Sequence, residues 1–262
     1  MIRPHMIWAL FLRHLYPLQR DFDLLSDLIY WPIIDTLLWG ITGQWLGSTS
    51  ADGARIVIAL MTGLLLWNVI WRAQAEVSRN LMDEIWNNNL VNLFSTPLSV
   101  LEWLVAVVLL SMVKTMVTIT LLAPAMFLLY KINVLALGEW MAVFFLGATM
   151  TGWWVGFISA GIVLRYGPKV QTVIWTLPGM LLPFSAIYFP VSQLPGWAQT
   201  VSLLVPTSYI FEAMRAVLAG SLVDWAQLGI SFGLNGLYLC CALWFFARSF
   251  RYSLSLGLGR FN

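Results

Sequence analysis

The sequence predicts an all-α integral membrane protein with six membrane-spanning helices. Of its 262 residues, 60% are hydrophobic and only 10% are charged, whereas a soluble domain carries roughly a quarter charged residues. Several apolar stretches reach about 20 residues, the length that a helix needs to cross the hydrocarbon core of a bilayer. Lysines and arginines are distributed unevenly between alternate sides of these stretches, as is usual for membrane proteins.

Residues 1–25 predict an amphipathic helix that lies along the membrane surface. Apolar residues recur there at helical spacing, with Arg20 and Asp21 among the polar ones. The alternative is a poorly ordered leader. A cleavable signal peptide is not expected, because Asp21, Asp23 and Asp27 follow the first apolar stretch where a small-residue cleavage site would stand.

Six apolar segments follow within a single domain, residues 1–262. The fifth is the least regular, because Pro178 and Pro183 remove backbone donors from it. The spans are predicted at residues 28–46, 56–73, 101–129, 140–164, 173–189 and 228–246. Between the last two, residues 190–224 predict two helices that are separated by Pro206 and too short to cross, and hence an extracytoplasmic re-entrant or interfacial hairpin.

The basic residues place both termini in the cytoplasm. With the N-terminus inside, the outer side holds only Arg55, Lys131 and Arg215, and Lys114 lies within a span. The inner side holds the other ten basic residues, which are Arg3, Arg13, Arg20, Arg72, Arg79, Arg165, Lys169, Arg248, Arg251 and Arg260. This distribution follows the positive-inside rule.

Two ionisable residues, Asp35 and Lys114, fall inside predicted spans. A bare charge there costs about 3 kcal/mol or more, so each needs a partner. Because a long lysine stem can bridge much of the distance between them, we expect the two side chains to form an ion pair. A proton relay that uses both residues is the sharper alternative.

Several other conspicuous residues predict packing rather than chemistry. Gly152 and Gly156 have the small-xxx-small spacing that lets two helices approach closely. The only cysteines, Cys240 and Cys241, are adjacent in an apolar run and predict neither a disulfide framework nor a metal site.

Known catalytic and nucleotide-binding patterns are absent from the sequence. No G-x-x-x-x-G-K-[ST] motif occurs, so the chain is not expected to bind ATP by that route. The only histidines, His5 and His14, precede the spans, which argues against a catalytic triad or a metal site in the membrane. A net charge of +2 without basic clusters argues against nucleic-acid binding. We therefore expect no catalytic residue, metal or cofactor in this chain.

Residues 76–100 form a cytoplasmic segment that is longer than a connecting turn requires. Apolar residues recur there at helical spacing, and Asn88 lies in an asparagine run that supplies a left-handed or capping position. Pro97 ends this short helix, and Ser99 is placed to cap the next span. Such a helix suits docking in a groove of a partner; the alternative is a helix that rests on the membrane surface.

This segment resembles the coupling segment of type-2 ABC transporter permeases. The family's pattern is matched by Glu84, Leu93, Thr96, Pro97, Leu98, Ser99 and Glu102. Ile85 replaces the usual basic residue, and Asn88 replaces the usual glycine, for which asparagine is the best substitute at a positive φ angle. The resemblance implies that contact with an ATPase involves Glu84, Ile85, Asn88, Leu90, Leu93, Phe94 and Pro97.

Residues 184–218 resemble the outer hairpin that precedes the last span in the same family, with Ala186 in place of a frequent glycine. The resemblance implies an outer gate made of Pro190, Leu194, Pro195, Trp197, Pro206, Tyr209, Glu212 and Arg215. Glu212 and Arg215 are three residues apart and are expected to pair on one helical face.

The resemblance covers nearly the whole chain and implies the permease subunit of an ABC exporter in a bacterial or archaeal inner membrane. It implies a two-fold dimer, or a pair with a similar permease, that carries two copies of an ATPase subunit holding ATP and Mg. A lipid, a lipid-linked polysaccharide and an amphipathic drug are all compatible substrates. The competing class is a proton-coupled secondary transporter that uses Asp35 and Lys114, and a third is a scaffold or channel without energy input.

Overall fold

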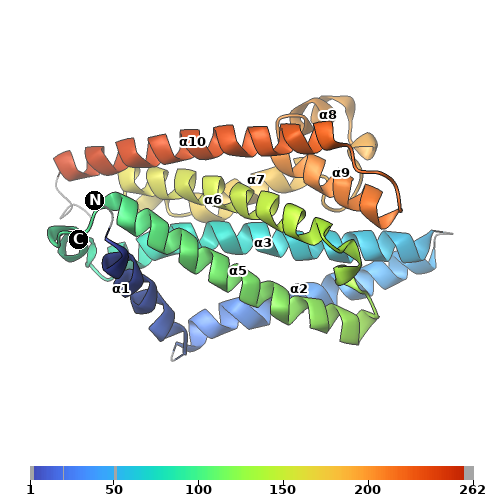
Figure 1. Ribbon diagram of the computed structural model, residues 1–262, viewed down its shortest axis with the longest axis horizontal. Coiled ribbons are helices and arrows are strands. Elements are labelled where there is room, and N and C mark those ends of the chain that lie inside the picture. The colour runs from blue at the N-terminus through green and yellow to red at the C-terminus, as the bar shows by residue number, and fades with distance from the viewer. Residues whose placement is uncertain (1–2, 20, 50–51, 257–262) are drawn as a thin grey trace.

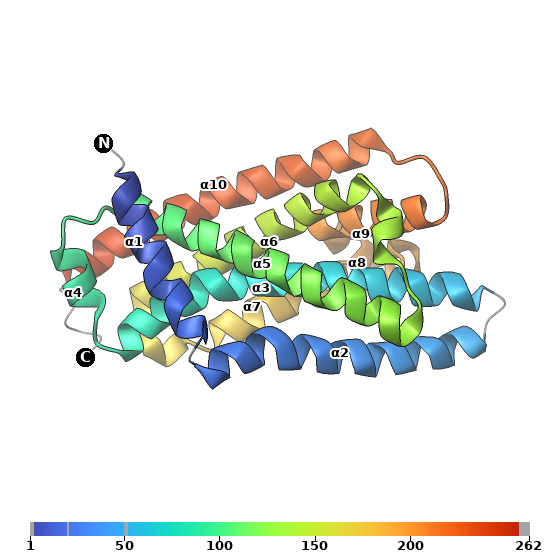
Figure 2. The ribbon, with the colours of Figure 1, turned by 60° about the horizontal axis from the view of Figure 1, so that its bottom comes forward.

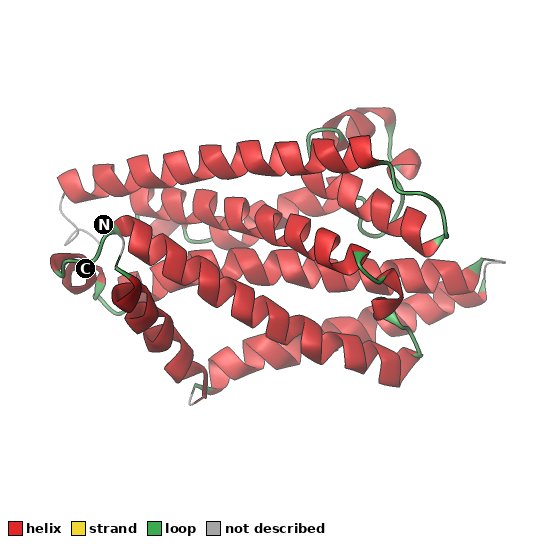
Figure 3. Cartoon of the chain, in the orientation of Figure 1, coloured by secondary structure: helices red, strands yellow, loops and turns green. Residues whose placement is uncertain are grey.

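The computed structural model describes residues 3–19, 21–49 and 52–256, and every regular element among them is a helix (Figure 3). Arg20, Arg260 and part of the expected 1–25 helix lie outside the described residues. Five long helices run roughly side by side along the molecule (Figures 1 and 2). Their bounds are α2 Phe22–Ser48, α3 Gly53–Trp86, α5 Val100–Tyr130, α6 Trp140–Tyr166 and α10 Trp225–Ser255.

Shorter helices lie at the two ends of this bundle. At one end, α1 crosses the long helices steeply beside α4 and the last turns of α10 (Figure 2); at the other, α8 and α9 lie over the first turns of α10 (Figure 1). The bounds are α1 Pro4–Leu15, η1 Tyr16–Gln19, α4 Leu90–Ser95, η2 Val134–Leu137, η3 Pro168–Val170, α7 Val173–Leu181, η4 Leu182–Phe184, η5 Val191–Gln193, α8 Gly196–Ser202 and α9 Pro206–Leu218.

The five long helices are each long and apolar enough to cross a membrane, and α8 with α9 forms a sixth candidate bent by 97°. This confirms the predicted all-helical membrane architecture, with five to six candidate spans among the described residues where the sequence predicts six. The predicted spans at 28–46, 101–129, 140–164 and 228–246 correspond to α2, α5, α6 and α10, and the one at 56–73 lies within α3.

The predicted fifth span at 173–189 is not one continuous helix. Its α-helical part, α7, has nine residues and a rise of only about 14 Å, too short to cross a bilayer. Pro183 lies in the 3₁₀ turn η4 that follows, and Ala186 has φ 60°, which takes the chain out of helical geometry. The prolines, which predict an irregular segment, are therefore a better guide here than the apolar composition, which predicts a continuous span.

Helices α3 and α6 form the centre of the bundle. Their apolar windows are 67% and 61% buried, against 22% for α2 and α10. Glycines allow this close contact, because a Cβ built on Gly152 would lie 2.5 Å from the Cβ of Ala73 and 2.6 Å from the carbonyl oxygen of Ile70. A Cβ on Gly156 would lie 2.8 Å from the carbonyl oxygen of Gln74. The predicted packing role of the two glycines is confirmed.

Replacement of Gly152 by alanine is expected to force α6 away from α3. Overpacking of this kind costs roughly 1–3 kcal/mol, so the Gly152→Ala variant should have a lower melting temperature in detergent. The matched control is Gly229→Ala on α10, where a Cβ meets nothing within 4 Å and alanine improves helix propensity. Equal melting temperatures for the two variants would contradict the packing assignment.

Candidate functional site

The chain between α3 and α5 turns at Asn88, which has φ 51° in the left-handed region. The backbone N–H of Asn88 donates to the carbonyl oxygen of Ile85 at 3.0 Å, and that of Asn89 donates to the carbonyl oxygen of Glu84 at 2.8 Å. These bonds close the end of α3 and direct the chain into the six-residue helix α4, which contains Phe94. The predicted positive φ at Asn88 is confirmed.

The two leucines of α4 face the protein and not the outside. Leu90 and Leu93 are only 2% and 8% exposed, and Ile85, before the turn, is 2% exposed. All three belong to one hydrophobic cluster of the bundle. A helix this short has one apolar face, and that face covers the end of the bundle. The surface open to a partner, here called the outward face, therefore differs in part from the one that the resemblance implies, although Asn88 and the exposed Pro97 belong to the implied set. The outward face consists of Trp86, Asn87, Asn88, Val91 and Asn92.

Glu84 joins the end of α3 to α1. Its carboxylate lies 2.7 Å from the Nη2 atom of Arg13 and accepts a 2.6 Å hydrogen bond from the Nδ2 atom of Asn89. The Glu84 side chain is only 3% exposed, so this charge is satisfied within the chain. The acidic residue that the family pattern assigns to ATPase contact is thus part of an internal ion pair.

Arg3 makes a second connection, from the start of α1 to the start of α5. Its Nη2 and Nε atoms donate to the two carboxylate oxygens of Glu102 at 2.8 and 2.9 Å, and Nη2 also donates to the carbonyl oxygen of Pro97. Glu102 and Ser99 form a reciprocal capping box, which confirms the predicted cap. Helix α1 therefore connects both ends of the segment that carries α4.

His14 lies beside Glu84 in the last turn of α1, with its Nε2 atom 3.9 Å from the Oε1 atom of Glu84. Burial lowers the pKa of His14 to about 4, against the opposing effect of the Glu84 carboxylate. The imidazole is thus neutral at neutral pH, and the Glu84 charge is balanced by Arg13.

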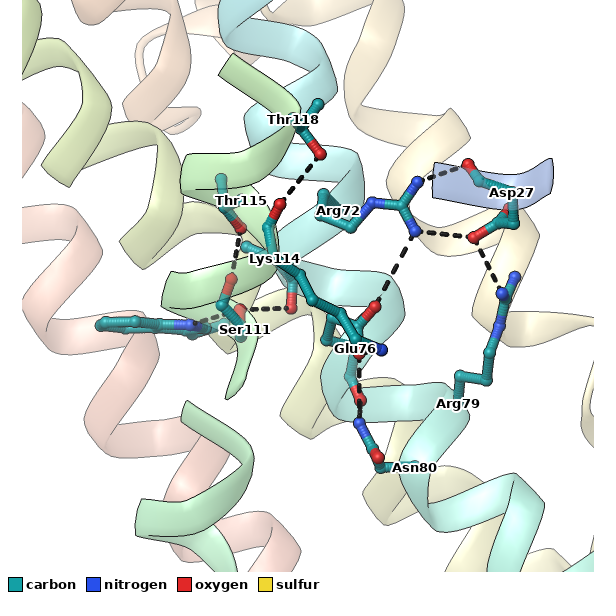
Figure 4. A network of polar contacts seen from close by, with 11 residues as sticks. Asp27, Arg72, Glu76, Arg79, Asn80, Ser111, Lys114, Thr115 and Thr118 are labelled. Carbon is teal, nitrogen blue, oxygen red and sulfur yellow. Dashed lines mark hydrogen bonds and ion pairs between the residues drawn. The ribbon is translucent and has the colours of Figure 1, made fainter. Parts of the chain in front are cut away.

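A buried ionic network connects α2, α3 and α5 (Figure 4). Lys114 lies 2.7 Å from Glu76, Arg72 lies 2.6 Å from Asp27 and 3.8 Å from Glu76, and Arg79 lies 2.8 Å from Asp27. Three positive and two negative side chains leave one surplus positive charge. Because charges in a membrane protein are costly without partners, this network holds the three helices in one arrangement.

The predicted ion pair of Asp35 with Lys114 is wrong, since Lys114 pairs with Glu76. The apolar pattern predicts that the second span ends at residue 73, whereas α3 continues to Trp86 and places Glu76 inside the bundle. The four-residue spacing of Arg72 and Glu76 was the available signal, because it places both charges on one face of a longer helix.

The segment that is predicted to form an outer hairpin is held together by Glu212 and Arg215. The Oε1 atom of Glu212 accepts a 2.7 Å hydrogen bond from the backbone N–H of Val191 and lies 3.2 Å from the Nη2 atom of Arg215. Arg215 also donates to the carbonyl oxygen of Ala186. The expected pair is confirmed, and it ties α9 to the chain that follows η4.

The other predicted outer-gate residues shape the same hairpin. Leu194 accepts a 2.8 Å hydrogen bond from the Nε2 atom of Gln199 through its carbonyl oxygen, and the Tyr209 hydroxyl donates to the carbonyl oxygen of Leu203 at 2.9 Å. Trp197 packs edge-on against Phe184. The prolines mark the starts of helices, since Pro190 precedes η5, Pro195 precedes α8 and Pro206 begins α9.

The Glu76–Lys114 pair is expected to be strongly coupled. Loss of one partner leaves an uncompensated buried charge and costs roughly 3–5 kcal/mol, so Glu76→Gln and Lys114→Gln should each lower the melting temperature. The double variant should lose less than the sum of the two. Asp35→Asn combined with Lys114→Gln is the control and should be additive. Additivity in the first pair, or coupling in the second, would contradict the assignment.

Acid is expected to weaken the attachment of α1 through His14. The folded pKa of about 4 lies below the unfolded value of 6.5, so the unfolded chain binds more protons between these values and stability falls as pH decreases through that range. Relative to His14→Gln, the wild type should lose about 1 kcal/mol by about pH 5.5. Melting temperatures of both proteins across this range measure the effect. A constant difference would contradict the buried neutral state.

Comparison with known families gives one match over most of the chain. Residues 8–219 match the family described as ABC-2 type transporter. This stretch covers α2 to α9 and most of α1, and so includes the segment around α4, the buried ionic network and the outer hairpin. A search among curated proteins finds no match. The chain is a multi-pass membrane protein that belongs to the ABC-2 type transporter family.

Proposed function

We propose that this chain is the permease half of an ABC exporter and is driven by a separate ATPase that binds the outward face of α4. The observation that carries the proposal is the construction of that face. Trp86 and Val91 are 56% and 40% exposed, while Leu90 and Leu93 anchor the same helix from behind. An exposed surface on a firmly held support is what a coupling element needs in order to transmit force.

The energy source belongs to the partner in this proposal. The sequence has no phosphate-binding loop, so ATP and Mg sit on the ATPase subunit. Two permeases, either two copies of this chain or one with a similar subunit, carry two ATPase subunits around a two-fold axis. Both termini and α4 face the cytoplasm, in keeping with the distribution of basic residues.

Helix α1 connects α4 to the membrane-spanning helices and so transmits a displacement of α4 to them. A push on α4 displaces Glu84 and Glu102, and the ion pairs with Arg13 and Arg3 carry that displacement to both ends of α1. Helix α1 is joined through η1 to α2. The force therefore reaches α2, α3 and α7, which we assign to the walls of the translocation path, while the α8–α9 hairpin forms the outer gate.

The competing proton-coupled carrier loses its main support. It relied on Asp35 and Lys114 as a relay, but Lys114 is held by Glu76 at 2.7 Å. Asp35 lies eight residues after Asp27 on α2, about two helical turns away, and among the described residues it pairs with no member of the network.

Val91→Asp is expected to abolish stimulation of the ATPase. A charge introduced on a docking surface leaves a desolvated acid without a partner, and the stimulated turnover in proteoliposomes should fall about tenfold or more. The matched control is Leu222→Asp, an apolar-to-acid change at a 97% exposed position in the loop before α10, which should stay within about twofold of wild type.

The two variants should share the wild-type elution profile and melting temperature, because both positions are on the surface. Undiminished stimulation by Val91→Asp, with the fold intact, would remove the outward face as the docking surface.

A further inference from the structure

Six aromatic side chains line a cavity between α2, α3 and the segment that includes α7 and η4. The cavity has a volume of about 540 Å³, within the range of roughly 300–1,000 Å³ that is typical of sites for drug-sized ligands. Its aromatic walls are Trp31, Trp39, Trp67, Trp71, Trp175 and Tyr188. The three elements are those assigned above to the walls of the translocation path.

Stacked aromatic pairs bound this cavity near both ends. Trp39 stacks on Tyr188 with ring centroids 4.4 Å apart, and Trp71 stacks on Trp175 at 6.0 Å. The guanidinium of Arg79 also lies 5.6 Å from the centroid of the Trp175 ring. The electron-rich faces of such rings attract cations.

Two acidic residues line the cavity and differ in their partners. Asp27 is neutralised by Arg72 and Arg79 at 2.6 and 2.8 Å. Asp35 also lines the cavity and is half-buried, yet no lysine, arginine or histidine among the described residues lies within ion-pair distance of it. The cavity thus contains one carboxylate without a direct ion-pair partner among the described residues, although Arg72 and Arg79, which Asp27 engages, line the same cavity.

Asp35 lies between two tryptophans on one face of α2. Trp31 and Trp39 lie four residues before and after it, on the same face of the helix. Tyr188 lines the same cavity. An acid among aromatic faces is the arrangement that recognises ammonium and related cations, by charge and by cation–π attraction together.

We propose that this cavity is a binding site for an amphipathic organic cation, with Asp35 as its counter-ion and Trp31, Trp39 and Tyr188 as the aromatic cage. The inference deepens the proposed function, on which it rests, by naming the substrate class of the path. The cation is expected to be bulky and largely apolar, because aromatic and aliphatic side chains make up most of the lining, whose other polar members are Asp27, Asn68, Arg72 and Arg79.

Other ligand classes fit the lining less well. A neutral sugar brings no positive charge to Asp35, and the Asp27 carboxylate, which two arginines hold, is not free to bind its hydroxyl groups. An organic anion would compete with Asp27 for Arg72 and Arg79 and would be repelled by the Asp35 carboxylate. An uncharged apolar ligand would leave that acid without a partner.

The test is equilibrium binding of radiolabelled tetraphenylphosphonium to the purified full chain in lipid nanodiscs, without any ATPase. Wild type should show saturable binding of one cation per chain. Asp35→Asn should weaken it about tenfold or more, and Trp39→Leu about fivefold. Asp35→Glu, which keeps the charge, should stay within about threefold of wild type.

Glu139→Gln is the matched control, because it removes the same charge at an exposed position before α6 and should leave binding unchanged. Equal affinity of wild type and Asp35→Asn would overturn the proposal. So would equally tight, Asp35-dependent binding of tetraphenylborate, an anion of the same shape, or displacement of the cation by a disaccharide.

The assay separates this site from the proposed coupling. Binding with the expected pattern, together with full ATPase stimulation by Val91→Asp, would support the cavity and reject the docking surface. Loss of stimulation in Val91→Asp, with no Asp35-dependent binding of the cation, would support the docking surface and reject the cavity.

Discussion

The ion pairs at the two ends of α1 are the interactions on which this account of the molecule depends. Arg3 binds Glu102 at the start of α5, and Arg13 binds Glu84 at the end of α3. The segment that carries α4 begins and ends at these two acids, so it cannot move without moving α1. A helix that lies across the end of the bundle thereby becomes the link between a peripheral surface and the membrane-embedded part of the protein.

Contacts within the bundle hold the long helices together. Glycine contacts lock α6 against α3, and the network around Glu76 connects α3 to α2 and α5 (Figure 4). Helix α7 contacts α3 through a 3.0 Å hydrogen bond from the Nε2 atom of Gln74 to the carbonyl oxygen of Ile174 and through the stacking of Trp71 on Trp175. The helical geometry after α7 is interrupted at Ala186. The cavity lies where the braced helices meet this interrupted one. In the proposed function, a site placed there would change shape when α2 moves relative to α7, which is the requirement for coupling between binding and transport.

Local signals were predictable from the sequence, and long-range partners were not. Asn88 and Ser99 act through their own backbone and near neighbours, so their roles followed from residue type and spacing. Lys114 illustrates the limit, because its partner depends on how far α3 continues before it ends. The orientation of Leu93 is likewise decided by which face of α4 the bundle must cover, and a six-residue helix carries no periodicity that could fix this.

The central claim is that a nucleotide-hydrolysing subunit pushes on the outward face of α4. The most direct measurement is site-specific photo-crosslinking in native membranes, with the photoreactive residue at position 91. The account predicts a covalent adduct with a protein that carries a phosphate-binding loop, and no such adduct from position 222 at the other end of the molecule. Adducts with lipid alone from position 91 in the functioning transporter would contradict it.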